Sequence, residues 1–361
     1  MTINIGIVGL AQSGKTTIFN ALTKGQADTK SATPHIGQAK VPEPRLKVLA
    51  DMLQPKRVVP AEVSYTDIGA TVKVAERGMG SQILGELSHT DALINVVRAF
   101  ADDSIPHIEG SLDVERDITA IDLELALHDA GIISRRLERI ETSMKGGTQP
   151  ERQQLSREQQ LLEKLNSKLE QEVPIRQLEL TADETKVISN FQFLTAKPLL
   201  IVVNIGEEQI CDTATLEAEL NSRHRGVGLG IITLCGKLEM ELTQLDDEAE
   251  KECRVEFGIT EPGLDRVIKL SYRLLDLITF FTTVSDEVKA WSIPRGTTAL
   301  KAAGKIHSDM ERGFIRAEAI SYDELMKCGS MAEAHKKGRL RLEGKGYTVQ
   351  DGDVITFLFN V

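Results

Sequence analysis

A glycine-rich loop near the N-terminus constrains the fold of this chain more than any other feature. Residues 9–16 read GLAQSGKT and match the pattern G-x-x-x-x-G-K-[ST]. The apolar run 3–8 before the loop is typical of a short buried strand, and residues 17–22 begin a helical pattern. A glycine-rich turn that matched by chance would lack these flanking elements. The sequence therefore predicts an α/β sheet that binds the phosphates of a nucleoside triphosphate.

Each residue type in this loop has a physical role in phosphate binding. The glycines let the backbone curl so that successive N–H groups point at a phosphate. Lys15 can neutralise the β- and γ-phosphates and is a catalytic candidate, while the Thr16 hydroxyl can hold Mg²⁺. We expect the loop and the first helical turn to hold the nucleotide through Gly9, Gln12, Ser13, Gly14, Lys15, Thr16 and Thr17.

Further apolar runs predict the rest of the sheet. Residues 61–67, 92–98, 199–204 and 230–234 each read as a strand, and helical patterns separate them. This alternation favours a doubly wound, mostly parallel sheet typical of a P-loop NTPase.

Two segments depart from the alternating pattern. Residues 132–172 are strongly charged with apolar residues at helical spacing, and residues 146–150 interrupt them, which predicts a hairpin of two antiparallel helices. A solvated insert without function remains an alternative. After residue 279 short strands and turns predict a small α+β module. The expected domains are a nucleotide domain (1–133 and 191–279), an inserted hairpin (134–190) and a C-terminal module (280–361).

Charge is distributed unevenly along the chain. The net charge is −11, but residues 281–361 carry 12 basic and 11 acidic side chains, so the acidity lies in the first 280 residues. Residues 335–341 (HKKGRLR) form a basic stretch that could contact RNA phosphates, although a solvated helix end explains it as well. The four cysteines are scattered without a C-x-x-C pair, which favours a reducing cytoplasm. No apolar run has the length of a membrane span, so we expect no membrane contact.

Polar residues at the ends of the predicted strands complete a candidate site. Asp67 ends the second strand, where a carboxylate can hold Mg²⁺ through water, or where it merely caps a turn. The run after it, Asp67-Ile68-Gly69-Ala70, resembles D-x-x-G with Ala70 in the place of the glycine. Asn204-Ile205-Gly206-Glu207 follows the fourth strand, where GTPases carry N-K-x-D. Its Ile205 and Glu207 alter the guanine clamp, unless the segment is an ordinary loop.

These motifs together resemble the Obg-like ATPase (YchF) family of P-loop NTPases. The resemblance covers essentially the whole length. It rests on the phosphate-binding loop with the helix that follows it, the N-x-x-E motif, and a C-terminal block. The block includes residues 302–309 (AAGKIHSD), 313–318 (GFIRAE) and 349–354 (VQDGDV). The family implies a G domain with an inserted hairpin, followed by a ubiquitin-like β-grasp (TGS) domain.

The resemblance also implies an activity and its partners. The family is implied to prefer ATP over GTP, to need Mg²⁺ and to hydrolyse slowly. It is also implied to act on the ribosome in translation and stress responses, contacting the large subunit or 70S rRNA through hairpin and TGS domain. Such a protein is expected to be a cytoplasmic monomer. By the same resemblance Cys235 and Gly236 lie in the loop that contacts the base, Ser31 aligns with a Mg²⁺-binding threonine, and His107 acts in hydrolysis. The residues alone favour an ordinary loop histidine at position 107 over a catalytic one.

Several positions depart from the family pattern. Gln12 stands where relatives carry asparagine, Ala70 replaces a glycine, no glutamine follows it, and the first switch lacks a clear threonine. We therefore expect nucleotide binding to be retained and hydrolysis to be altered. The main hypothesis is a slow ATPase switch. The alternative is a nucleotide-stabilised ribosome- or RNA-binding module with little or no turnover. A metabolic kinase is disfavoured because no acceptor-binding segment is recognisable.

Overall fold

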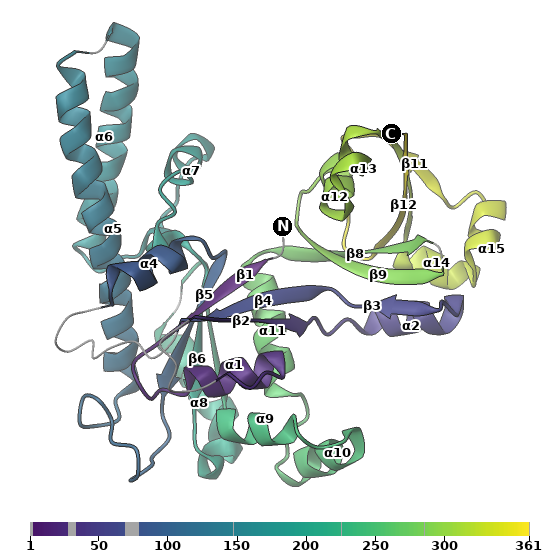
Figure 1. The fold of residues 1–361 in the computed structure, drawn as a ribbon, viewed down its shortest axis with the longest axis horizontal. Helices are drawn as coiled ribbons and strands as arrows, with labels where there is room; N and C mark the ends of the chain where they lie inside the picture. Colours follow the sequence, from purple (N-terminus) through teal and green to yellow (C-terminus); the bar gives the residue numbers. More distant parts are fainter. Residues whose placement is uncertain are drawn as a thin grey trace. The chain divides into compact units, whose positions relative to one another are not determined.

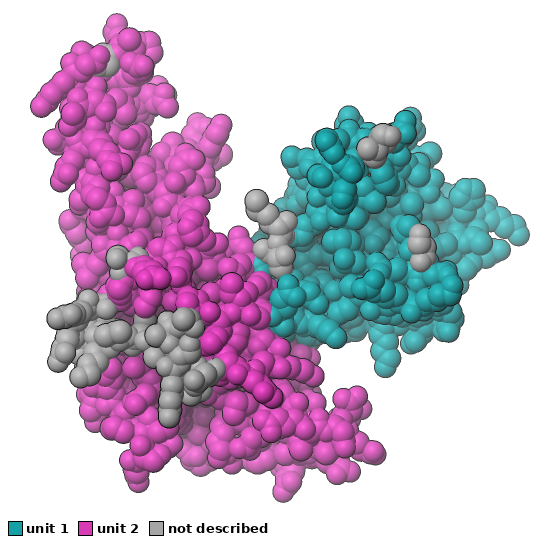
Figure 2. Space-filling view, viewed as in Figure 1, with its two compact units in different colours: residues 1–3, 38–63, 268–361 teal, residues 4–37, 64–267 magenta. Residues whose placement is uncertain are grey.

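The computed structural model describes residues 3–27, 34–68, 79–146, 148–224, 226–284 and 286–360. The chain divides into two compact units, shown in Figure 2. Unit 2 comprises residues 4–37 and 64–267, and unit 1 comprises residues 1–3, 38–63 and 268–361. The domain boundaries expected at residues 134, 191 and 280 remain predictions.

A six-stranded sheet carries the phosphate-binding loop. Its strand order is β2-β4-β1-β5-β6-β7. The pairs β4–β1, β1–β5, β5–β6 and β6–β7 are all parallel. The strands span β1 (Asn4–Val8), β2 (His35–Lys40), β4 (Glu62–Asp67), β5 (Ala92–Arg98), β6 (Leu199–Asn204) and β7 (Leu229–Leu234). The predicted parallel α/β sheet is confirmed. The strand β2 was not predicted, because its alternation of exposed and half-buried residues gives it no apolar run.

Helices accompany this sheet in the pattern strand–helix–strand (Figure 1). They are α1 (Lys15–Thr23), α4 (Ser81–Ser88), α5 (Val114–Met144), α6 (Gln149–Leu169), α7 (Ala182–Ile188), α8 (Thr213–Arg223), α9 (Gly236–Leu242), α10 (Asp247–Glu256) and α11 (Gly263–Leu274). Short 3₁₀ turns lie at Ile175–Gln177, Leu194–Ala196 and Glu207–Asp212. Among the described residues, no helix is long and apolar enough to cross a membrane.

The predicted helical hairpin is formed by α5 and α6, which lie side by side in Figure 1. Its apolar stripe is buried between the two helices, with Ile140, Leu162 and Leu165 fully enclosed. An ion pair of 2.7 Å between Arg136 and Glu158 joins the helices beside this core. The stripe therefore stabilises the hairpin itself instead of remaining open for a partner.

The helix α5 begins earlier than the sequence pattern predicted. Asp113 caps it by accepting a hydrogen bond of 3.0 Å from the Arg116 main-chain N–H. Further along the helix, the buried Asp129 carboxylate accepts bonds from the Leu194 and Thr195 main-chain N–H groups, at 3.0 and 2.7 Å. A single helix thus belongs to the sheet core at its first turns and to the hairpin at its last.

Unit 1 contains a second six-stranded sheet, ordered β11-β10-β12-β8-β9-β3. Antiparallel β8 and β9 are followed by a helix, and β12 pairs in parallel with β8 and antiparallel with β10. The predicted small α+β module is confirmed. Its elements are α2 (Pro44–Leu53), β3 (Arg57–Val59), β8 (Leu277–Val284), β9 (Glu287–Pro294), α12 (Ala299–Ile306), α13 (Ser308–Arg312), β10 (Phe314–Ser321), α14 (Tyr322–Cys328), α15 (Met331–Lys336), β11 (Arg341–Glu343) and β12 (Asp353–Phe359).

An early segment of the chain completes this second sheet. Residues 38–63 belong to unit 1, where β3 pairs in parallel with β9. Arg45 in this segment forms an ion pair of 2.8 Å with Asp351 and lies 5.6 Å from the centre of the Phe281 ring. Sequence patterns did not reveal this pairing, because its partners are separated by more than 200 residues.

Candidate nucleotide-binding site

The phosphate-binding loop has the backbone conformation that its glycines permit. It connects the end of β1 to the start of α1, with φ angles of 145° at Gly9 and 92° at Gly14. A Cβ atom on Gly9 would lie 2.3 Å from the Val96 carbonyl oxygen, and one on Gly14 would lie 2.2 Å from the Asn204 amide nitrogen. Neither position accepts a side chain. Gln12 also has a positive φ, 62°, and is exposed.

Lys15 is buried at the first turn of α1. Its ammonium group donates hydrogen bonds to the carbonyl oxygens of Gly9, at 2.9 Å, and Leu10, at 2.7 Å. Burial lowers the pKa of Lys15 from its ordinary value to about 8, although the Asp67 carboxylate acts in the opposite direction. A cation held by two neutral carbonyls in a buried loop favours replacement of those carbonyls by phosphate oxygens.

Two side chains, one in the first turn of α1 and one at the end of β4, suit a divalent cation. The Thr16 hydroxyl donates a 2.6 Å hydrogen bond to Asp67 Oδ2. Asp67 is fully buried, and its Oδ1 has no hydrogen-bond partner among the described residues. A hydroxyl beside a buried, half-satisfied carboxylate is the hard oxygen donor set that Mg²⁺ prefers. These residues therefore fit Mg²⁺ bound together with the phosphates.

Other predicted members of the phosphate site lie nearby or outside the described residues. The Ser13 hydroxyl is buried, and its oxygen has no partner among the residues that the structure describes. Thr17 follows on α1 and is half-buried. Ser31 and Ala70 lie outside the described residues. No three His, Cys, Asp or Glu side chains gather into a metal site within the described ranges.

Asn204, at the end of β6, connects the two loops that border the site. Its amide nitrogen donates to the Ser13 carbonyl oxygen at 3.0 Å, and its amide oxygen accepts from the Gly236 N–H at 2.9 Å. Both ends of the side chain are therefore used in holding main-chain groups. The sequence placed Asn204 correctly at a strand end, but not this bridging role between residues far apart in the chain.

The remaining residues of the predicted base loop lie around the start of α9. Glu207 forms an ion pair of 2.9 Å with Lys237, and this raises the pKa of the Lys237 ammonium. Cys235 is buried, and burial raises the pKa of its thiol. Lys237 follows Cys235 and Gly236 in the loop predicted to contact the base, and it is a further candidate site residue. It lies three residues after β7 and pairs with the acidic residue in the altered N-K-x-D position.

His107 lies in the loop between β5 and α5. Its Nε2 is 2.9 Å from Asp117 Oδ2, and its Nδ1 accepts a 3.1 Å hydrogen bond from the Glu109 N–H. The side chains of His107 and Asp117 are only 5% and 3% exposed. The structure therefore ties this histidine to the first turns of α5. Sequence reasoning missed Asp117 entirely.

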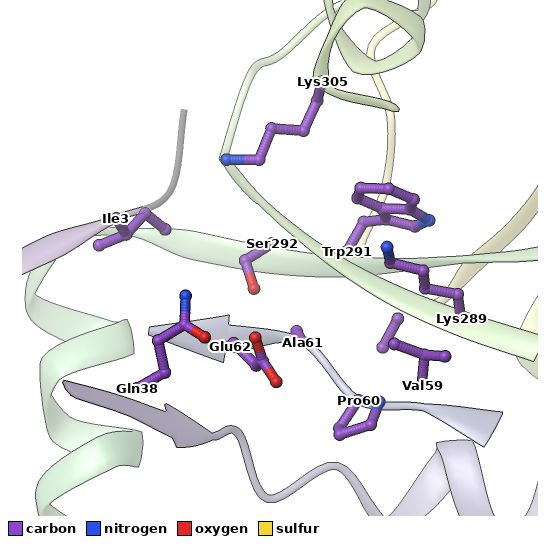
Figure 3. A pocket seen from close by; sticks show the side chains of 11 residues that line it. Ile3, Gln38, Val59, Pro60, Ala61, Glu62, Lys289, Trp291, Ser292 and Lys305 are labelled. Atoms are coloured by element: carbon purple, nitrogen blue, oxygen red, sulfur yellow. The ribbon is translucent and has the colours of Figure 1, made fainter. Parts of the chain in front are cut away.

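A separate cavity of about 170 Å³ lies within unit 1 (Figure 3). Lys289 and Trp291 line this cavity, and the Lys289 ammonium lies 3.8 Å from the centre of the Trp291 ring. Lys305 from α12 and Glu62 from β4 also line the cavity.

The basic stretch of residues 335–341 in this unit is partly neutralised, because Lys336, Arg339 and Arg341 lie 3.4–3.9 Å from acidic side chains.

Known proteins resemble this chain over its full length. A protein named "Ribosome-binding ATPase YchF" from Bacillus subtilis (strain 168) is 40% identical, and one of the same name from Escherichia coli O157:H7 is 39% identical, each covering 100% of both chains. The solved structure of the Schizosaccharomyces pombe YchF GTPase matches with a TM-score of 0.87 at 30% identity, covering 99% of this chain and 98% of that one.

A family model also matches the C-terminal part of the chain. The model, YchF-GTPase_C, is described as "Protein of unknown function (DUF933)" and matches residues 277–360. These residues contain the module formed by β8 to β12. The full-length identity to the curated relatives, together with the fold, leads to one conclusion: the chain belongs to the YchF family.

Proposed function

We propose that this chain binds ATP at the loop of residues 9–16, hydrolyses its β–γ bond slowly and acts as a switch on the ribosome. The observation that carries the proposal is the buried Lys15, held by two replaceable carbonyls beside the Thr16–Asp67 pair. The relatives at 39–40% identity are named ribosome-binding ATPases, which supports the same activity here.

The preference for ATP over GTP rests on the altered base loop. In the N-K-x-D clamp a short carboxylate accepts hydrogen bonds from guanine. Here Glu207 is longer, and its carboxylate is engaged by the Lys237 ammonium at 2.9 Å. Asn204 is engaged at both ends of its amide. Guanine would have to displace these bonds, whereas adenine presents no such pair of N–H donors to a carboxylate. The relatives are named both ATPase and GTPase.

Calorimetric titration of the nucleotide-free protein with non-hydrolysable ATP and GTP analogues tests the preference. We expect the ATP analogue to bind at least about tenfold more tightly, a difference of about 1.4 kcal/mol. Glu207→Asp combined with Ile205→Lys rebuilds the guanine clamp and should narrow or reverse the ratio. Tighter binding of the GTP analogue by the unaltered protein would contradict the proposal.

For hydrolysis, Lys15 stabilises negative charge on the transferred phosphoryl group, and His107 accepts a hydrogen bond from the attacking water. When bound, Mg²⁺ would neutralise charge on the β- and γ-phosphates, with Thr16 and Asp67 holding it and Ser31 as a further candidate ligand. Because of the departures at Gln12 and in the switch segments, we expect slower turnover than in a relative with the standard loops. Equal steady-state turnover would refute that expectation.

For the ribosome, we propose that the hairpin and the C-terminal module, as a TGS domain, contact RNA of the large subunit or the 70S particle. The hairpin presents long charged helices with their apolar stripe already buried. Lys336→Glu with Arg339→Glu should weaken ribosome co-sedimentation and lower the slope of log affinity against log salt by about 2. Lys301→Glu with Arg312→Glu, an equal charge change at exposed sites of unit 1, is the matched control. Equal losses in both variants would contradict a specific basic contact.

A nucleotide-stabilised binding module with little turnover is the second candidate. The observation that favours it is the engagement of both His107 ring nitrogens, which leaves no ring nitrogen open to water in this conformation. Turnover of the unaltered protein and of His107→Ala, each with and without ribosomes, separates the two functions. A turnover that ribosomes do not raise and His107→Ala does not lower would support the binding module. For either function, we propose that the protein acts in the cytoplasm as a monomer.

A further inference from the structure

The proton on His107 has a defined place in this structure. The Glu109 main-chain N–H can only donate, so the Nδ1 atom that it contacts at 3.1 Å carries a lone pair. An ionised carboxylate can only accept, so the Nε2 atom 2.9 Å from Asp117 Oδ2 carries the hydrogen. The two contacts together select the Nε2–H tautomer.

Three further features hold the Asp117 carboxylate in place. Arg116 donates to Asp117 Oδ1 from Nε at 3.0 Å and from Nη2 at 2.8 Å. Arg116 is itself fixed by a 2.7 Å bond from Nη2 to the Ser111 carbonyl oxygen. Asp117 also lies in the acidic first turn of α5, where the helix dipole favours negative charge. One carboxylate oxygen therefore serves the arginine and the other serves the histidine.

We infer that Asp117 is a positioning residue for His107, an inference that rests on the proposed role of His107 in hydrolysis. Asp117 keeps the hydrogen on Nε2, so that Nδ1 is the nitrogen able to accept from the attacking water. In the structure the Glu109 N–H occupies that lone pair. Replacing this single main-chain hydrogen bond by the water activates the histidine, while the bond to Asp117 persists.

The step balances without any additional reactant. As the water oxygen bonds to the γ-phosphorus, its proton passes to Nδ1, and the bond from phosphorus to the bridging oxygen breaks with its electron pair leaving on the diphosphate. The imidazolium formed is stabilised by the Asp117 carboxylate. Nδ1 then releases its proton to the product phosphate or to solvent. Asp117 contacts neither water nor phosphate and acts only through the histidine.

Asp117→Asn tests the inference, with Asp113→Asn as its matched control. The first substitution removes the acceptor that fixes the tautomer. The second makes the same chemical change four residues earlier, at the cap of α5, where asparagine caps as well as aspartate does. We expect Asp117→Asn to lower kcat for ATP about ten- to a hundredfold, with KM changed less than about twofold. This loss does not exceed the roughly hundred- to ten-thousandfold that general base catalysis itself supplies. Asp113→Asn should leave both values within about twofold.

Two further measurements separate positioning from simple stabilisation. In the His107→Gln background, Asp117→Asn should cause no additional loss of kcat, because the group it positions is gone. The ring ¹⁵N chemical shifts of His107 should show a lone-pair Nδ1 and a protonated Nε2 in the unaltered protein, and a mixture of tautomers in Asp117→Asn.

Each outcome decides one part of the reasoning. An Nδ1–H tautomer in the unaltered protein, or an equal loss of kcat from Asp117→Asn in both backgrounds, would overturn the positioning role. Unchanged kcat in His107→Gln would overturn the catalytic role of the histidine, and with it the kinetic part of this inference. The ¹⁵N shifts would then still establish whether Asp117 fixes the ring. Failure of the proposed function and failure of the inference are thus distinguishable.

Discussion

The buried state of Lys15 predicts that ATP affinity depends on pH above neutrality. In the nucleotide-free protein burial lowers the pKa of this lysine to about 8. Contact with phosphate oxygens favours the protonated form, so the pKa rises again when ATP binds. Between these two values, binding must be accompanied by uptake of a proton. ATP affinity is therefore fully present well below pH 8 and falls as the pH rises through 8.

The magnitude follows from linkage. A group with a pKa of about 8 is protonated in roughly nine-tenths of the free molecules at pH 7 and in about one-tenth at pH 9. The Kd for ATP should therefore rise about tenfold between these pH values, which is about 1.4 kcal/mol of binding free energy. Proton uptake should be about 0.5 per ATP at pH 8 and about 0.9 at pH 9.

Calorimetry with a non-hydrolysable ATP analogue, in pairs of buffers that differ in ionisation enthalpy, measures both quantities. Lys15→Arg should bind more weakly but without pH dependence, because an arginine stays protonated. Lys237→Gln is the matched control and should retain the slope, since the Glu207 ion pair already keeps the Lys237 pKa raised. Cys235 does not confound the range, because burial raises the pKa of its thiol. A Kd that stays constant to pH 9, with no proton uptake, would refute the reasoning.

Three further predictions concern stability and the architecture of the site. Because the Lys15 pKa is lower in the folded protein than its ordinary 10.5, the unfolded chain binds more protons between pH 8 and 10.5. The free energy of unfolding of the nucleotide-free protein should therefore increase across this window, by up to about 3 kcal/mol. Urea unfolding at pH 7.5 and pH 10 measures this change, and a lower free energy of unfolding at pH 10 would contradict the prediction. Asn204→Ala leaves a buried carbonyl and a buried N–H unpaired, so it should lower the free energy of unfolding by about 3 kcal/mol and weaken ATP binding. Asp129→Ala removes the acceptor of two buried N–H groups at the base of the hairpin and should cost a similar amount, about 3 kcal/mol. Calorimetry of that variant should show unchanged ATP affinity, and a loss of affinity would contradict its purely structural role.

Local patterns in the sequence were sufficient for most strands of the first sheet and for the helical hairpin. The loop of residues 9–16 identified the strand before it and the helix after it, because each glycine and the Lys–Thr pair act within a single turn of chain. The strands β4, β5, β6 and β7 were predicted as apolar runs because both faces of a parallel sheet are covered. The leucine spacing of the hairpin predicted helices whose stripe is buried between them.

Interactions between distant residues were decided only in the tertiary structure. Asn204 meets Ser13 across 191 positions, and residues 38–63 join the sheet of the C-terminal module. The partnership of His107 with Asp117 spans only 10 positions, yet it depends on how the loop folds back on α5. Periodicity and motif spacing report what a residue does within its own element. Which polar groups meet is set by the desolvation of buried atoms, because each must find a partner wherever the packed chain supplies one. The sequence by itself thus determined a phosphate-binding α/β fold, and the tertiary structure determined which side chains hold its loops and its histidine in place.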